Sequence, residues 1–183
     1  MKRLISKIIF FVLGWKIIGS TAFPKKCIII AAPHTSNWDF LYGRCFSYIV
    51  HINPKYLAKS QLFIPVLGYF LRLNGGIPVY RDSKNDIVQQ MICLFKEHKN
   101  FILAIAPEGT RSRVSKWKTG FYYIALEAKV PIMLTGIDYR KKEVGVIDQF
   151  IPTGNFIKDM NFIQNKFQSL TPKYSKNYNI NIF

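Results

Sequence analysis

Short, unbroken apolar runs recur along the sequence and alternate with stretches of helical periodicity. The first run, 27–32, has six consecutive apolar residues and ends at Pro33. Such a run is typical of a strand buried on both faces. Further strands are expected at 56–58, 77–80, 101–106, 132–137 and 144–150, and helices at 37–50, 61–73, 83–99, 120–128 and 158–170. The alternation predicts an α/β fold with a largely parallel or mixed buried sheet flanked by helices.

The chain is predicted to hold one domain behind an unusually apolar N-terminus. Its 183 residues suit a single core, and no Pro/Gly/Ser-rich linker divides them. Lys7 and Lys16 interrupt the first apolar stretch, which falls short of the roughly 20 residues that span a bilayer. We predict a membrane-associating helix over residues 1–22, lying in the bilayer interface, and an α/β domain over 23–183. The alternative is a helix docked on the domain's own core.

The charge and the cysteines limit the class of protein. There are 26 Lys+Arg against 10 Asp+Glu, a net charge of +16. Such a chain attracts nucleic acid, an anionic bilayer, or acidic substrates and carriers, and charge alone does not choose among them. The three cysteines form no C-x-x-C or Cys/His cluster, which argues against a disulfide framework or a zinc site and for a reducing compartment. All three are expected to be buried thiols.

Polar side chains follow three of the predicted strands. His34, Arg81 and Glu108 each come within a few residues of a strand end. In α/β sheets functional groups gather beyond the carboxyl ends of the strands, so these side chains are expected in one crevice. Asp39 would lie on the first turn of the next helix and reach back to one imidazole nitrogen of His34. The other nitrogen can then take a proton from a hydroxyl. A structural pair at a helix start remains the alternative.

The other two segments suit a phosphorylated hydroxyl compound. Arg81 follows a glycine pair and a short strand, where an arginine suits bidentate phosphate binding. Glu108 can accept a hydrogen bond from a hydroxyl, backbone N–H groups around Gly109 and Thr110 can form an anion nest, and Arg111 can pair with a phosphate. The alternatives are a surface arginine after a turn and a solvated loop.

Four ordered blocks resemble the glycerolipid (lysophosphatidate-type) acyltransferases. They are His34-x4-Asp39, 76–81 (GIPVYR), 107–112 (PEGTRS) and 130–132 (VPI), with 58–68 and 117–120 as additional similarities. The resemblance implies transfer of a fatty acyl group from a thioester, acyl-CoA or acyl carrier protein, to a hydroxyl of a glycerol-phosphate-type acceptor, with lysophosphatidate preferred. Pro33, where asparagine is common, and Ala106, where phenylalanine is frequent, depart from the pattern and bear on the acceptor.

The resemblance also implies roles for individual residues. His34 is the base and Asp39 its partner. Glu108, Arg81 and Arg111, with the loop at Gly109 and Thr110, hold the acceptor. Lys59, Gly76 and Pro131 line the acyl groove or support it.

A thioester is already activated, so no metal or other cofactor is expected beyond the acyl donor. The expected partners are a membrane lipid surface and the donor, possibly acyl carrier protein. Nucleic acid is not expected, since no helix-turn-helix, zinc or RNA-recognition signature occurs. The implied location is the cytoplasmic face of the membrane, as a peripheral or monotopic protein. The alternatives are an acyltransferase acting on a lyso-aminolipid or glycerol 3-phosphate, and a non-catalytic basic protein that binds membrane or nucleic acid.

Overall fold

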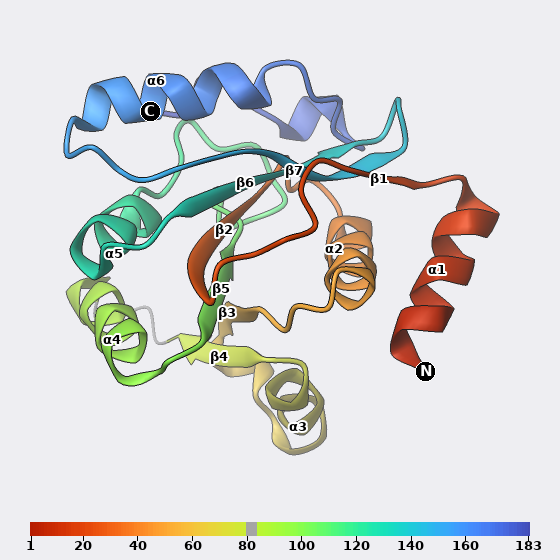
Figure 1. The fold of residues 1–183 in the computed structure, drawn as a ribbon, viewed down its shortest axis with the longest axis horizontal. Helices are drawn as coiled ribbons and strands as arrows, with labels where there is room; N and C mark the ends of the chain where they lie inside the picture. Colours follow the sequence, from red (N-terminus) through yellow and green to blue (C-terminus); the bar gives the residue numbers. More distant parts are fainter. Residues whose placement is uncertain (80–83) are drawn as a thin grey trace.

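Strands from across the chain form one mixed sheet in the computed structural model, which describes residues 1–79 and 84–183. The seven strands of this described part are β1 (Lys16–Ile18), β2 (Lys26–Ala32), β3 (Lys55–Lys59), β4 (Gly76–Val79), β5 (Phe101–Ile105), β6 (Ile132–Asp138) and β7 (Glu143–Phe150). Their order is β1-β7-β6-β2-β5-β3-β4, and all neighbours are parallel except β6 and β7 (Figure 1). The predicted α/β class with a mixed sheet is confirmed. Only β1 has no counterpart among the strands expected from the sequence.

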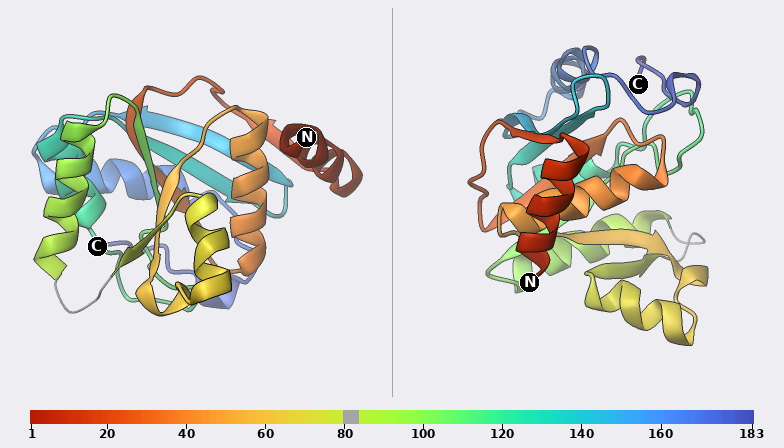
Figure 2. Two further views of the ribbon diagram at one scale, coloured as in Figure 1. Left: turned by 90° about the horizontal axis from the view of Figure 1, so that it is seen from below. Right: turned by 90° about the vertical axis from the view of Figure 1, so that its right-hand side faces the viewer.

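Helices cover both faces of the sheet (Figure 1, Figure 2). They are α1 (Lys2–Leu13), α2 (Asn37–Ile49), α3 (Pro65–Leu73), α4 (Lys84–Glu97), α5 (Gly120–Ala128) and α6 (Phe156–Phe167), with short 3-10 helices η1 (Ser60–Leu62) and η2 (Ser175–Asn177). Helices α4, α5 and α6 contribute to the core on one face, α1 and α2 to the core on the other. Helix α3 stands beside β4 at the edge of the sheet.

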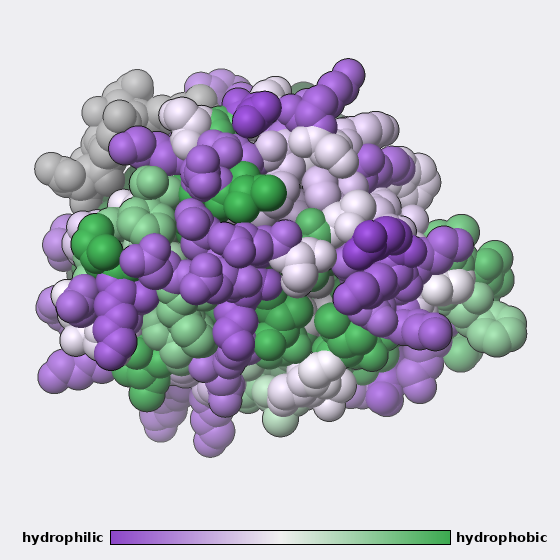
Figure 3. All heavy atoms as spheres, turned by 90° about the horizontal axis from the view of Figure 1, so that it is seen from above, coloured by the Kyte–Doolittle hydropathy of each residue, from purple (hydrophilic) through white to green (hydrophobic). Residues whose placement is uncertain are grey.

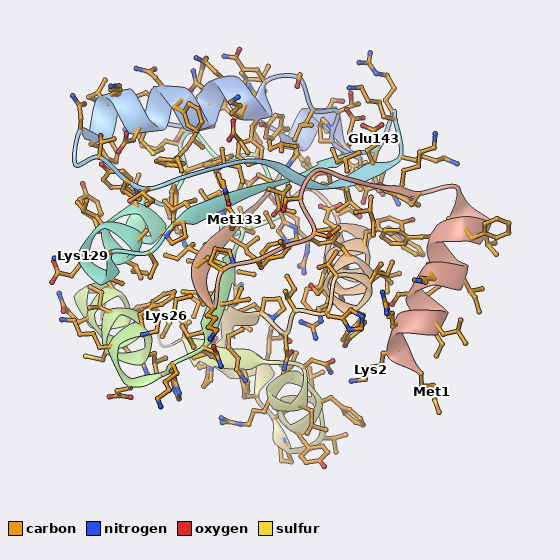
Figure 4. The ribbon with its side chains drawn as sticks, viewed as in Figure 1. Met1, Lys2, Lys26, Lys129, Met133 and Glu143 are labelled. Atoms are coloured by element: carbon orange, nitrogen blue, oxygen red, sulfur yellow. The ribbon has the colours of Figure 1, made fainter. Side chains whose placement is uncertain are left out.

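Alternate residues of β2 enter two separate cores. Ile28 and Ile30 pack in the core covered by α4, α5 and α6, whereas Cys27 and Ile29 pack in the core covered by α1 and α2. None of the four is more than 5% exposed. Met133 of β6, at the centre of the sheet in Figure 4, pairs with Ile29. A strand buried on both faces offers no solvent-facing position, which explains the unbroken apolar run.

Three local predictions need correction. The expected helix over residues 1–22 ends at Leu13, because Gly14 adopts the left-handed conformation that commonly ends helices, and the chain then joins the sheet as β1. The expected helix over 61–73 is divided into η1 and α3, since Pro65 occupies the first turn of a new helix. Cys93 is exposed on α4, whereas Cys27 and Cys45 are buried as expected.

Helix α1 has one docked face and one exposed face. Ser6 and Phe10 are buried, and the Phe10 ring lies 6.3 Å from that of Tyr42 in α2. The other face carries exposed apolar side chains: Leu4, Ile5, Ile8, Phe11 and Val12. Figure 3 shows hydrophobic surface at the right-hand end of the molecule, where α1 lies. Among the described residues, no helix has both the length and the apolar character needed to cross a bilayer.

Adjacent phenylalanines of α1 provide a test of this docking. Phe10 is 4% exposed and Phe11 is 87% exposed. Phe10→Ala should lower the free energy of unfolding by about 3 kcal/mol, because it leaves a cavity between α1 and α2. Phe11→Ala is the matched control and should change it by less than about 0.5 kcal/mol. Urea unfolding followed by circular dichroism measures both; equal effects would contradict the docked orientation.

Candidate active site

Three polar side chains lie just beyond the carboxyl ends of neighbouring strands. His34 follows β2, Glu108 follows β5, and Tyr139 directly follows β6. Because β2 lies between β5 and β6 and runs parallel to both, these ends meet at one edge of the sheet. The structure therefore brings His34 and Glu108 together and adds Tyr139. The position of Tyr139 two residues beyond the strand predicted over 132–137 was the sequence signal for it.

The start of α2 determines the geometry of the histidine–aspartate pair. Ser36 is the N-cap, its hydroxyl oxygen accepts from the N–H of Trp38, and Asp39 accepts from the N–H of Ser36, which completes a capping box. The carboxylate is thereby directed back over the helix start, where Nδ1 of His34 lies 3.4 Å from Oδ2 of Asp39. Within the described part of the chain, Nε2 of His34 has no hydrogen-bond partner, and the side chain is 19% exposed.

Asp39 is the most connected group at this edge. Its Oδ2 accepts from the N–H groups of Thr35 and Ser36, both at 2.7 Å, and its Oδ1 accepts from the hydroxyl of Tyr139. Burial alone would raise the pKa of Asp39, but the hydrogen bonds from His34 and Tyr139 outweigh it and hold the pKa below its usual value. Asp39 is therefore an anion at neutral pH that can keep a proton on Nδ1 and leave Nε2 free to accept one.

Glu108 is 5% exposed and lies against His34. Its Oε1 accepts from the backbone N–H of His34 at 2.9 Å, whereas Oε2 is buried without a hydrogen-bond partner among the described residues. Burial raises the pKa of Glu108 to about 7. Near neutral pH the group is therefore present in both protonation states, and Oε2 can donate to or accept from a hydroxyl placed beside it.

The loop after Glu108 uses its own polar groups to form a turn. Gly109 has a φ of 64°, which favours glycine, and its N–H donates to the carbonyl of Ala106 at 3.0 Å. The Thr110 hydroxyl accepts from the N–H of Ser112 at 3.3 Å. The Gly109 N–H is thus already bonded within the turn.

Two cations belong to the same loop region. Arg111 is exposed and makes no hydrogen bond or ion pair with any residue that the structure describes. Lys118, which belongs to the similar segment 117–120 but was given no role of its own, lies over Gly109: a Cβ added to that glycine would meet Nζ of Lys118 at 2.9 Å. Both side chains can meet an anion close to Glu108.

The remaining predicted site residues are dispersed. Arg81 lies outside the described residues. Lys59 ends β3 at the same edge as His34 and is exposed. Gly76 begins β4, where an added Cβ would lie 2.9 Å from a carbonyl oxygen of α3, and the carbonyl of Pro131, just before β6, accepts from β2 at 3.0 Å. Gly76 and Pro131 lie at the amino-terminal ends of their strands, whereas His34 lies beyond the carboxyl end of β2. They can therefore support the sheet but cannot contact the site.

The C-terminal tail, residues 171–183, passes over the end of the sheet that carries His34 and Glu108. The N–H of Tyr174 donates to Oγ1 of Thr35 at 3.3 Å. Tyr178 is buried, and its hydroxyl has no partner among the described residues. Burial and the nearby charge of Glu108 raise the pKa of Tyr178, which keeps the hydroxyl protonated. The tail has no periodic pattern, so nothing in the sequence indicated this contribution.

Two surface hollows lie away from these residues. One of about 190 Å³ is lined by Phe150, Asp159 and Phe162, and one of about 430 Å³ by residues that include His51 and Phe101. Neither adjoins His34.

Comparisons with known proteins agree with one another. The profile of the family described as Acyltransferase matches residues 15–137. 1-Acyl-sn-glycerol-3-phosphate acyltransferases from Saccharomyces cerevisiae and Limnanthes douglasii are 31% and 29% identical over 127 and 157 residues, which are 64% and 76% of this chain and 41% and 54% of theirs. The chain thus spans about half the length of the curated relatives it matches.

A solved structure shares the fold. The crystal structure of the 1-acyl-sn-glycerophosphate acyltransferase PlsC from Thermotoga maritima matches with a TM-score of 0.62 and 19% identity. The match covers 90% of this chain and 74% of that chain.

The raised pKa of Glu108 predicts a pH dependence of stability. Its carboxyl has a folded pKa of about 7 against an ordinary 4.5, so the folded state holds the proton more tightly than the unfolded state. This contribution is complete below pH 4.5 and is lost as the pH rises through about 7. Wild-type protein should lose up to roughly 3 kcal/mol relative to Glu108→Gln over that window, at 1.36 kcal/mol per pKa unit.

Unfolding at a series of pH values measures this difference. Glu127→Gln, which changes an exposed glutamate of α5, is the matched control and should follow the wild type. Parallel curves for wild type and Glu108→Gln would show that the carboxyl is not held neutral by burial.

Proposed function

Because this chain belongs to the Acyltransferase family, we propose that it moves a fatty acyl group from a thioester to a hydroxyl of a glycerol-phosphate-type acceptor. We take 1-acylglycerol 3-phosphate as the acceptor, since two relatives bear the name of that activity. The observation that carries the proposal is the His34–Asp39 pair, with one imidazole nitrogen facing the carboxylate and the other without a hydrogen-bond partner among the described residues.

The pair supplies the base that this reaction needs. An aliphatic hydroxyl is a weak nucleophile, and Nε2 of His34 can remove its proton as the oxygen attacks the thioester carbonyl. Asp39, kept anionic by its hydrogen bonds, stabilises the imidazolium that results. As the carbon–sulfur bond breaks, the imidazolium can return the proton to the departing thiolate, so that the histidine ends neutral. Such a base typically contributes about 10²–10⁴-fold.

Glu108 and the cations of the adjacent loop suit the acceptor. Oε2 of Glu108, buried without a partner among the described residues, can hold a hydroxyl of the glycerol beside His34. Arg111 and Lys118 can bind its phosphate, with about 1.5–3 kcal/mol for each hydrogen bond to a charged group. Arg81, which lies outside the described residues, is proposed to join them on the strength of the family resemblance.

The exposed face of α1 supports a location at the membrane surface. Leu4, Ile8 and Phe11 are more than half exposed, and Lys2, Arg3 and Lys7 lie on the same helix. An apolar face with basic neighbours is typical of a helix in the interface of an anionic bilayer. We place the protein peripherally or monotopically on the cytoplasmic side, where a lysolipid presents its phosphate, with either acyl-CoA or acyl carrier protein as donor.

Replacement of the base tests the reaction. His34→Ala should lower kcat by at least about 10²-fold, the low end for a general base. The measurement is mass spectrometry of phosphatidate formed from lysophosphatidate with acyl-CoA or acyl-acyl carrier protein, and with lyso-aminolipid and glycerol 3-phosphate as competing acceptors. His98→Ala is the matched control, because His98 is exposed and precedes β5 at the opposite edge.

A milder substitution distinguishes loss of the proposed chemistry from loss of the folded structure. Tyr139→Phe keeps the ring but removes the hydroxyl that donates to Asp39, so kcat should fall by less than in His34→Ala. Near wild-type turnover in His34→Ala would contradict the assignment. Wild-type protein that binds vesicles but forms no product with any donor would instead favour the non-catalytic alternative.

The outer face of α1 is tested by substitutions that leave its docked face intact. Phe11→Glu and Val12→Glu should each weaken binding to anionic vesicles roughly tenfold or more, since a buried apolar side chain of this size is worth about 1.5–3 kcal/mol. Co-flotation with vesicles measures binding, and Ile157→Glu on α6 is the control, because Ile157 is also exposed. Unchanged flotation of both α1 variants would contradict the membrane role of this helix.

A further inference from the structure

Helix α3 exposes a second apolar surface. Its members, together called the α3 face, are Ile64, Val66, Leu67, Tyr69, Phe70 and Leu73, with exposures between 42% and 71%. Gly68 is the buried residue of this helix. Soluble monomers rarely leave so many neighbouring large apolar side chains in water, and larger exposed patches mark protein or membrane contacts.

The α3 face is not needed to attach the helix to the protein. A Cβ on Gly68 would lie 2.7 Å from the carbonyl carbon of Phe63, and one on Gly76 would lie 2.9 Å from the carbonyl oxygen of Leu71. The contact at Gly68 lies within the turn that begins α3, whereas the contact at Gly76 brings α3 against β4. The large side chains of the α3 face are exposed and remain available to a partner.

Charge around the α3 face favours a bilayer as that partner. Residues 1–79 contain ten lysines and arginines but one acidic residue, Asp39, which is buried. On α3 itself, the Arg72 guanidinium lies 5.1 Å from the centroid of the Phe63 ring, and Lys59 is exposed at the end of the preceding strand. These two charged neighbours, Arg72 and Lys59, are both cations, and an apolar surface with such neighbours matches the interface of an anionic membrane, where acyl chains lie beneath anionic headgroups.

The end of α3 is connected through α2 to the start of α1, the helix already proposed to meet the membrane. Nζ of Lys2 lies 5.3 Å from the centroid of the Tyr48 ring, and the Tyr48 hydroxyl donates to Oδ1 of Asn74, the C-cap of α3, at 3.1 Å. The start of α1 and the end of α3 therefore approach each other through α2, which lies between them in Figure 1 and Figure 2. A bilayer surface that contacts α1 can therefore also contact α3.

We propose that the α3 face is a second membrane contact, which inserts into the interface of an anionic bilayer beside α1. It rests on the proposed function only in that the acceptor is a membrane lipid, since binding needs no catalysis. Because η1 connects α3 to the carboxyl end of β3, this contact holds the sheet edge that carries His34 close to the bilayer. Two separate contacts fix the orientation of that edge as well as its distance from the membrane.

Charged substitutions on the α3 face test the proposal in the full-length chain. Val66→Glu and Tyr69→Glu, at positions 71% and 62% exposed, should each reduce co-flotation with vesicles of phosphatidylglycerol and phosphatidylcholine by about tenfold. Ile157→Glu, 58% exposed on α6, is the matched control and should bind as the wild type does. Circular dichroism should report an unchanged fold in all three.

A second measurement reports insertion directly. Tyr69→Trp should add fluorescence that brominated phosphatidylglycerol quenches, whereas Ile157→Trp should add fluorescence that it does not quench. Unchanged flotation of both glutamate variants, or no added quenching at position 69, would overturn the proposal. A wild-type dimer that becomes monomeric in the glutamate variants with vesicle binding intact would also overturn it, because a second copy would then cover the α3 face.

The test remains distinct from the test of the reaction. The glutamate variants should lose activity on lysophosphatidate in vesicles at least tenfold more than on a short-chain, water-soluble analogue. Equal losses on both would overturn the docking role. Wild-type protein that is inactive on both substrates would contradict the proposed function. Flotation and quenching would still test whether the α3 face contacts the bilayer.

Discussion

The carboxylate of Asp39 is the interaction on which the site depends. One oxygen accepts the two N–H groups that begin α2 and faces Nδ1 of His34, while the other accepts the hydroxyl of Tyr139. The same group therefore caps a helix and orients an imidazole. The structural role of the His34–Asp39 spacing is compatible with the proposed functional one, because the capping geometry is what directs the carboxylate toward the histidine.

An aromatic cluster connects this carboxylate to the N-terminal segment. The Trp15 ring lies 4.1 Å from that of Tyr42 and 5.2 Å from that of Tyr139, measured between centroids. Phe10 of α1 packs on the same Tyr42. The docked face of α1 thus belongs to the core that supports the Asp39 network, while its opposite face is free for a membrane. A helix attached in this way holds the site and the proposed bilayer surface in a fixed relation.

Glu108 completes the site from the other side of His34. Its contact with the His34 backbone links the loops after β2 and β5, and the tail closes over both through Tyr174 and Tyr178. Burial keeps this carboxyl partly protonated near neutral pH, in contrast to the anionic Asp39. Two carboxyl groups on either side of one histidine therefore differ in charge because one is surrounded by donors and the other is left partly unpaired.

The sequence by itself determined the α/β class, nearly every strand, and the placement of His34 and Glu108 at one edge, because apolar runs and the parallel-sheet rule are local or topological properties. It did not reveal β1, which three residues form only by pairing with β7. Nor did it identify Tyr139, which donates to Asp39 100 residues away along the chain, or Tyr178, which lies near the charge of Glu108 70 residues away. Tertiary structure alone decided which face of α1 is docked and that α3 is exposed, since a helix that is apolar around its circumference does not specify which side meets the protein.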